Sequence, residues 1–185
     1  MRTALTFGLC AAILGSAILP AQASDADDAA RAVRGFYAVY ATFHPSDGIP
    51  DAKGRAKYAP FLSPTLEDLL KRGNEAELAF ARANKDSPPL IEGDLFTSNF
   101  EGATSYKVGA CKGDARSARC PVALTYDDSA SNPKDKPLSW NDTVYLVGTP
   151  SGWRVDDIGY GASWDFGNKG RMSETVKGAI ANATE

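Results

Sequence analysis

Apolar positions along the first third of the chain recur with the period of a helix. After Ser24, a predicted N-cap that carboxylates follow, they repeat every three to four residues and form one stripe. The stripe consists of Ala29, Val33, Phe36, Tyr37 and Tyr40. Such a stripe predicts an amphipathic helix that packs on a sheet or on another helix, and it ends before the loop that begins at His44-Pro45.

Shorter helical patterns follow this first helix. Residues 57–61 are compatible with a short helix, and Ser63-Pro64 then marks the start of another, with three leucines along its buried edge. Gly73-Asn74 is expected to end or kink that helix before residues 75–83 resume it. Pro88-Pro89 excludes further helix, and a last amphipathic helix is predicted over residues 172–182.

Between these helices the apolar period changes to two, which is typical of strands. Alternation over residues 106–110 and 122–126 predicts one hairpin, with a cysteine pair between its strands. Residues 140–147 and 153–160 predict a second hairpin, because the turn-forming segment 148–152 separates them. Helices followed by a four- to six-stranded antiparallel sheet indicate an α+β domain in which helices cover one face of the sheet.

The stretch 152–166 is predicted to be the central strand of that sheet, running into an aromatic and acidic wall. Its apolar residues change phase, because Trp153 and Val155 are odd-numbered whereas Ile158 and Tyr160 are even-numbered. We therefore expect a β-bulge near 156–157, which would bend the strand and turn a carboxylate toward a concave interior. Trp153 and Val155 are expected to be buried on the helix-covered face.

The N-terminal residues read as a signal peptide covering 1–23. Arg2 precedes an apolar run over residues 4–19, and Ala21-Gln22-Ala23 has the small-x-small pattern that signal peptidase accepts. Cleavage before Ser24 would leave a single domain over residues 24–185, exported to the periplasm. The run is too short and wrongly flanked for a membrane-spanning helix, and Cys10 lies too early for the usual lipid-anchor pattern.

Composition narrows the class of protein further. Residues are 43% hydrophobic and 23% charged, which suits one globular domain with a real core. Without Arg2, 19 basic residues face 23 acidic ones, so the mature charge of −4 argues against nucleic-acid binding. Cys111 and Cys120 form an even pair in an oxidising compartment, and this predicts a structural disulfide. Neither a metal site nor a cofactor is expected.

Acidic residues that recur beside aromatic ones are the best candidates for a binding site. The candidates are Glu92, Asp94, Trp140, Asp142, Asp156, Asp157, Tyr160 and Trp164. Carboxylates among aromatic rings serve as acid and base, or bind sugars and cationic groups. The alternative is structural, because aspartates near strand ends commonly cap backbone and aromatic residues at strand spacing are commonly core.

We expect four of these acidic residues to form one cluster that binds a partner or ligand without turnover. They are Glu92, Asp142, Asp156 and Asp157. Trp164 is expected near the mouth of the cavity. His44, the sole histidine, has no nucleophile near it in the sequence, and residues 161–165 lack the second glycine of a nucleophile elbow. No catalytic constellation is complete.

The order of elements and three motifs resemble a known family. The motifs are residues 88–96 (PPLIEGDLF), Trp140-Asn141-Asp142, and the strand that contains Asp156-Asp157. They resemble the bacterial exported family called domain of unknown function 3828, within the nuclear-transport-factor-like, or cystatin-like, superfamily. The resemblance implies a cone-like curved antiparallel sheet packed on N-terminal helices, export and a pocket, but no agreed activity.

Two functions from different classes follow from these observations. In the first, the chain is a periplasmic, non-enzymatic binding or immunity-type protein that docks a cell-envelope protein or a small ligand through an acidic, aromatic surface. In the second, it is a small-molecule enzyme of the isomerase or dehydratase type, with Asp156 or Asp157 as a general base inside the cone. The missing histidine and nucleophile chemistry favours the first. The oligomeric state is left open.

Overall fold

The computed structural model describes residues 21–43 and 48–183, with side chains from Asp25 onward. Its elements run in the order α1 (Ala21–Thr42), α2 (Ala52–Tyr58), the 3-10 helix η1 (Ala59–Phe61), α3 (Pro64–Ala83), β1 (Ser105–Val108), β2 (Lys112–Gly113), β3 (Ser117–Tyr126), β4 (Leu138–Thr149), β5 (Gly152–Gly159) and α4 (Met172–Asn182). Residues 1–20 of the expected signal peptide, and His44, lie outside the described residues.

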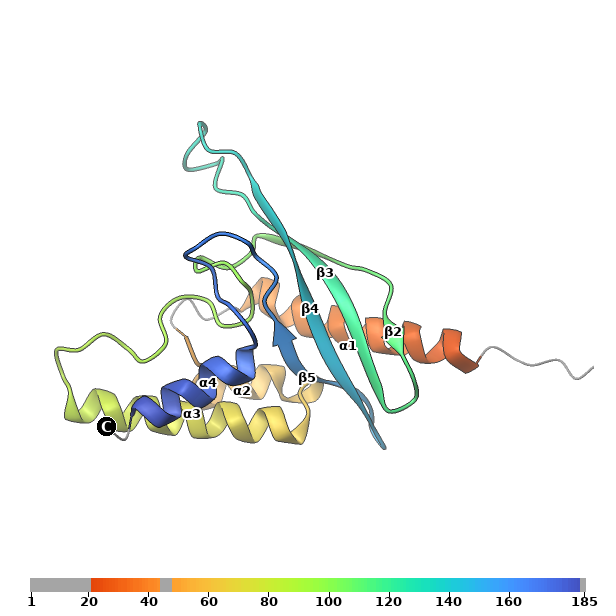
Figure 1. Cartoon of the computed structure of the whole chain (residues 1–185), viewed down its shortest axis with the longest axis horizontal. Coiled ribbons are helices and arrows are strands. Elements are labelled where there is room, and N and C mark those ends of the chain that lie inside the picture. The colour runs from red at the N-terminus through yellow and green to blue at the C-terminus, as the bar shows by residue number, and fades with distance from the viewer. Residues whose placement is uncertain (1–20, 44–47, 184–185) are drawn as a thin grey trace, which may run out of the picture.

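The strands form one five-stranded antiparallel sheet, and this confirms the predicted α+β class. The order is β1-β3-β4-β5, and the two-residue β2 also pairs with β3. The sheet is curved and does not close on itself (Figure 1). The narrower, cone-like assignment remains a prediction.

Helix α1 covers one face of the sheet and carries the apolar stripe into the core. All five stripe residues predicted from the sequence are buried. The Tyr37 ring stacks on the Tyr106 ring of β1, with ring centroids 5.3 Å apart. Within α1 it also contacts the rings of Phe36 and Tyr40, at centroid distances of 5.2 and 5.7 Å. The predicted N-cap is wrong in one respect, because α1 begins at Ala21 and Ser24 lies inside it. The alanine-rich residues before Ser24 favour helix and extend it toward the N-terminus.

The two following helices differ from the predictions at their ends. α2 begins at Ala52, because the Asp51 carboxylate accepts the backbone N–H of Gly54 at 2.7 Å, and η1 continues it to Phe61. α3 begins after Ser63 as predicted, with the Ser63 hydroxyl accepting from Leu66 N at 3.0 Å. It does not stop at Gly73.

Gly73 serves close packing in the middle of α3. A Cβ atom at this position would lie 2.7 Å from both Ile49 Cδ1 and Val176 Cγ1. The glycine therefore lets α3 approach α4 closely, and the remaining helical residues on both sides keep the helix continuous to Ala83.

β5 is an edge strand, which corrects the prediction of a central strand. Its free edge is covered by other segments, since Ser63 N donates to Val155 O at 2.8 Å and Tyr160 N donates to Gly170 O at 3.0 Å. Such cover hides the unpaired backbone groups that an open edge would present. Trp153 and Val155 are buried as predicted, with 8% and 0% of their surface exposed.

The predicted β-bulge is confirmed in β5. Val155 lies opposite Leu146 and Asp157 lies opposite Tyr145, so Asp156 is the extra residue. Because the insertion restores the phase, both Val155 and Ile158 reach the buried face. The phase change in the apolar pattern thus has the cause that the sequence indicated.

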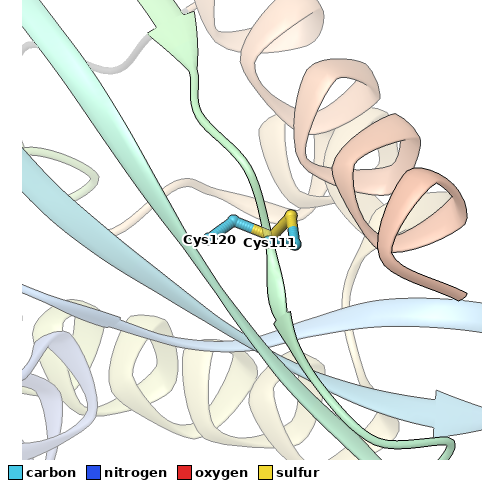
Figure 2. The surroundings of a disulfide bond; sticks show 2 residues. All are labelled: Cys111 and Cys120. Atoms are coloured by element: carbon cyan, nitrogen blue, oxygen red, sulfur yellow. A yellow bond between two sulfur atoms is a disulfide. The ribbon is translucent and has the colours of Figure 1, made fainter. Parts of the chain in front are cut away.

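The Cys111–Cys120 disulfide is present and joins the edge of the sheet to β3. Figure 2 shows the bond between β3 and the short segment before β2. Both cysteines are buried. The bond holds β2, which pairs with β3 over only two positions, against the sheet.

Replacing both cysteines by serine should lower the free energy of unfolding by about 2.7 kcal/mol, because the disulfide closes a loop of about ten residues in the unfolded chain. Urea denaturation of the double variant and the oxidised protein measures this difference. Equal denaturation midpoints would contradict a stabilising role for the bond.

Candidate functional site

The most unusual feature of the interior is a buried segment without regular secondary structure. Residues 94–99 form neither helix nor strand, yet every one of them is buried. A buried backbone needs a hydrogen-bond partner for each polar group that leaves water. We call residues 94–99 the buried segment, and its partners define the candidate site.

Asp94 opens the buried segment and is 1% exposed. Its carboxylate accepts the hydroxyl of Tyr40 at 2.8 Å and the backbone N–H of Phe96 at 2.7 Å. Tyr40 in turn accepts the N–H of Ala103 at 2.8 Å. Gly102, with φ of +80°, lies against this pair, because a Cβ there would be 2.5 Å from the Tyr40 hydroxyl.

Burial dominates the electrostatics of Asp94. It raises the pKa of the carboxyl from 3.8 to about 7, although the hydrogen bonds from Tyr40, Phe96 and Thr97 act in the opposite direction. Within the described residues, no cationic side chain forms an ion pair with Asp94. The Tyr40 hydroxyl is affected as well, since burial first and Asp94 second raise its pKa.

Asp142 of β4 joins three parts of the chain through one carboxylate. It accepts the backbone N–H of Ser98 at 2.8 Å and that of Gly161 at 2.9 Å, and the Ser98 hydroxyl also donates to it. The indole N–H of Trp140 donates to the same carboxylate at 3.1 Å. Asp142 therefore ties the buried segment and the chain after β5 to the sheet.

Two further side chains satisfy carbonyl groups of the buried segment. The Tyr160 hydroxyl donates to Leu95 O at 2.7 Å. The Asn168 amide donates to Asp94 O at 2.9 Å and to Thr97 O at 2.8 Å. Burial, followed by the nearby Asp94, raises the pKa of Tyr160. These bonds anchor the buried segment to the loop over residues 160–170.

Four of the predicted site residues meet at the buried segment. They are Asp94, Trp140, Asp142 and Tyr160, of which Tyr160 is partly buried and the others buried, and their polar atoms bind backbone or other side chains. Ser98 and Asn168 belong to the same network, but sequence analysis misses them. They lie in irregular loops, where no periodic signal marks them.

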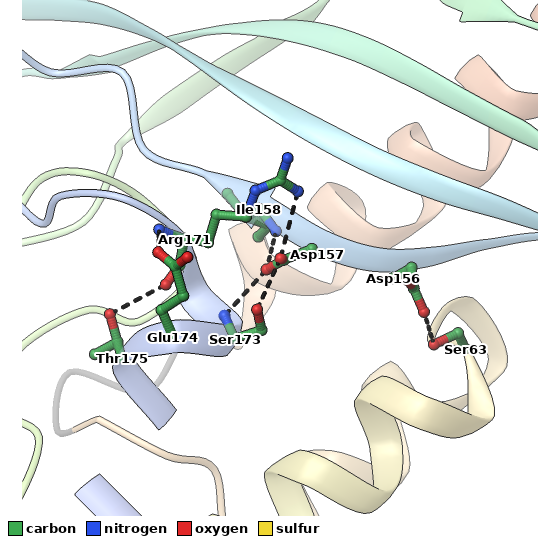
Figure 3. Close-up of polar contacts among 8 residues, drawn as sticks. All are labelled: Ser63, Asp156, Asp157, Ile158, Arg171, Ser173, Glu174 and Thr175. Carbon is green, nitrogen blue, oxygen red and sulfur yellow. Dashed lines mark hydrogen bonds and ion pairs between the residues drawn. The ribbon is translucent and has the colours of Figure 1, made fainter. Parts of the chain in front are cut away.

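Asp156 and Asp157 lie apart from this network, at the bulge (Figure 3). Asp156 accepts the Ser63 hydroxyl at 2.5 Å, beside the N-terminus of α3. Asp157 accepts the backbone N–H and the hydroxyl of Ser173 at 3.0 and 2.8 Å, in the first turn of α4, and pairs with Arg171 at 3.5 Å. Each carboxylate thus complements the positive end of a different helix.

The single acidic cluster predicted from the sequence is not formed. Asp142 binds the buried segment, Asp156 and Asp157 bind the starts of α3 and α4, and Glu92 is exposed. The physical reason is that each buried carboxylate is satisfied by nearby N–H and hydroxyl donors, which come from different parts of the fold.

Trp164 lies where the interior meets the surface. It is half-buried, and its ring contacts that of Trp140 edge-on, with centroids 5.6 Å apart. The ammonium of Lys169 donates to the carbonyls of Ala162 and Trp164 and so folds this loop back on itself.

Beyond Trp164, exposed and partly exposed apolar and acidic residues gather at one end of the molecule. The group, which we call the acidic-aromatic end, comprises Phe100, Glu101, Tyr126, Asp127, Asp128, Asp135, Leu138, Trp164, Asp165 and Phe166. Tyr126 lies opposite Leu138 where β3 ends and β4 begins, and Figure 1 shows these two strands extending beyond the helices. Asp127 N donates to Thr104 Oγ1 and so joins the end of β3 to the segment before β1. Asn168 N donates to Ser98 O and joins the loop over residues 160–170 to the buried segment.

No protein-family model matches the chain, and no curated protein matches it either.

Among the described residues, no helix is long and apolar enough to cross a membrane. The same residues include no group of three or more His, Cys, Asp or Glu side chains that could hold a metal ion.

Asp94 should make the protein more stable as the pH falls from about 8 to about 5. Its pKa is raised in the folded state, so the folded protein binds the proton more tightly than the unfolded chain, and stability rises as pH drops through 7 toward 3.8. Over the whole interval from pH 7 to 3.8 the effect is at most about 4 kcal/mol, and the part between pH 7 and about 5 is smaller. Urea denaturation across this pH range measures it, and Asp94→Asn should flatten the profile.

Asp114→Asn is the matched control. Asp114 is exposed, and backbone hydrogen bonds from Arg116 and Ser117 lower its pKa, so its contribution is constant above about pH 5. An Asp94→Asn variant that kept the pH slope of the unaltered protein would contradict the role assigned to Asp94.

Proposed function

We propose that this chain is an exported, non-enzymatic binding protein of the periplasm that docks a cell-envelope protein through its acidic-aromatic end. The observation that carries the proposal is the exposure of large apolar side chains there: 51% for Phe100, 39% for Leu138 and 86% for Phe166. Aromatic residues are enriched at protein interfaces, and grouped exposed apolar residues mark contact sites.

The charges at this end favour a partner with a cationic surface. The acidic residues of this end, all exposed or partly exposed, are Glu101, Asp127, Asp128, Asp135 and Asp165. Partial burial first, and then Asp128, Glu101 and Asp135, raise the pKa of Tyr126. Complementary charge around an apolar centre speeds encounter and disfavours partners of the same sign. An immunity-type role, with an envelope hydrolase as the partner, is one form of this function.

The compartment is proposed on chemical grounds. The Cys111–Cys120 disulfide suits an oxidising compartment, because such bonds are kept reduced in the cytosol. The signal-peptide pattern of residues 1–23 supports the same compartment.

The alternative, a small-molecule enzyme with an aspartate base, has less support. Asp156 and Asp157, its proposed bases, bind the Ser63 hydroxyl and the N-terminal turn of α4. Asp94 has a pKa near 7, which suits a general base, but it is 1% exposed. Substrate would need a route to it.

Site-specific photo-cross-linking tests the docking surface. A photoreactive amino acid placed at position 100, 138 or 166 should cross-link one envelope protein, and the yield should saturate as the amount of extract increases. The same residue at position 78 is the matched control, because Leu78 on α3 is 51% exposed, as is Phe100.

Replacing two exposed aromatic side chains by serine tests the same surface. Phe166→Ser with Phe100→Ser should abolish capture of that protein while leaving the melting temperature near that of the unaltered protein, because both side chains are exposed. Cross-linking from position 78 with equal yield, or capture that survives both substitutions, would sink the proposal.

A further inference from the structure

A groove crosses the outer face of the sheet, on the side away from α1. It has a volume of ≈ 480 Å³ and is lined by residues of β2, β3, β4, β5 and the start of α4. A row of directly opposed residues forms its length, in which Lys112 lies opposite Arg119, Arg119 opposite Tyr145, and Tyr145 opposite Asp157. Residues opposed in this way share one face of a sheet, so the four side chains line the same side.

The carboxylates at the acidic end of this groove already have partners. Asp157 is paired with Arg171 and accepts two hydrogen bonds from Ser173, and Asp156 accepts the Ser63 hydroxyl. Figure 3 shows both carboxylates directed toward the starts of α3 and α4. The positive ends of these helices offset the remaining negative charge.

Arg171 also has its partners within the groove. Its guanidinium lies over the Tyr145 ring, with Cζ 3.7 Å from the ring centroid, while one nitrogen pairs with Asp157. The cation and the ring together make a flat, rigid part of the groove wall. Such a wall offers planar contact to an aromatic or apolar group.

The charges that remain uncompensated are both positive. Lys112 and Arg119 are exposed and directly opposed across β2 and β3, and neither side chain makes an ion pair or hydrogen bond within the described part of the chain. Like charges in this position destabilise a sheet. In a chain with a net charge of −3, two adjacent free cations at the end of a groove are the chemistry of an anion site.

We propose that the groove binds a small organic anion. Its carboxylate or phosphate group lies between Lys112 and Arg119, and its aromatic or apolar body lies along the wall made by Tyr145 and Arg171. The volume of the groove falls within the range of small-molecule sites. This site is separate from the acidic-aromatic end, so it stands whether or not the protein docks a partner there.

Titration of the full mature chain with phenyl phosphate and with benzoate, followed by amide NMR shifts, tests the site. Either anion should shift the amides of Gly113, Ser117 and Tyr145, which line the groove, with saturation. Neutral benzyl alcohol should bind at least tenfold more weakly, because it lacks the charge-assisted hydrogen bonds. Binding of the anions should also weaken as sodium chloride is raised.

Variants that remove one positive charge each provide a second test. Arg119→Gln and Lys112→Gln should each weaken binding of the better anion by about tenfold, and neither should lower the melting temperature, since relief of like-charge repulsion offsets the lost side-chain contacts. Lys107→Gln, an exposed lysine on the same face of β1, is the control and should bind as the unaltered protein does.

Three results would overturn the inference. They are the absence of saturable shifts with both anions, equal binding of benzyl alcohol, and binding that survives loss of both Lys112 and Arg119. A preference for phenyl phosphate over benzoate, or the reverse, would support the site and identify which anionic group it prefers.

Discussion

Burial of residues 94–99 without a helix or a strand is the constraint on which this structure depends. A buried polar group left without a partner costs about 1–3 kcal/mol, so a six-residue irregular segment inside the core must be supplied with donors and acceptors from elsewhere. Asp142, Tyr160 and Asn168 supply them from β4 and from the loop after β5. Tyr40 supplies another from α1.

This requirement explains why polar residues gather in the interior. Asp142 holds the buried segment, the sheet and Gly161 together, and the same network positions the loop that carries Trp164 and Phe166. The two aspartates of the bulge have a parallel task within β5, where they fix the starts of α3 and α4 to the sheet. Most of the acidic residues that suggest a binding site therefore stabilise the fold. The surfaces proposed for binding are the acidic-aromatic end and the cationic end of the groove.

Local patterns in the sequence predict much of the fold. The helical stripe of α1, both hairpins and the bulge follow from apolar spacing and turn residues, because each depends on residues close together in the chain. The edge position of β5 does not follow, because strand order depends on contacts between distant segments. The same limit applies to Asp142, whose partner Ser98 is 44 residues away in an irregular loop. Trp164 is the one sequence-based candidate that lies at the acidic-aromatic end. Lys112 and Arg119 become a pair only through the pairing of β2 with β3, which no local pattern predicts.

Amide hydrogen exchange at Ser98 and Phe96 tests the central claim most directly. If the buried segment is held as described, both amides should exchange only at the rate of global unfolding, like the amides of β3 and β4, because their N–H groups donate to Asp142 and Asp94 in the interior. Asp142→Asn should lower the protection of Ser98 together with that of the whole sheet. Exchange of Ser98 and Phe96 as fast as that of exposed loop amides, while β3 and β4 remain protected, would contradict the account.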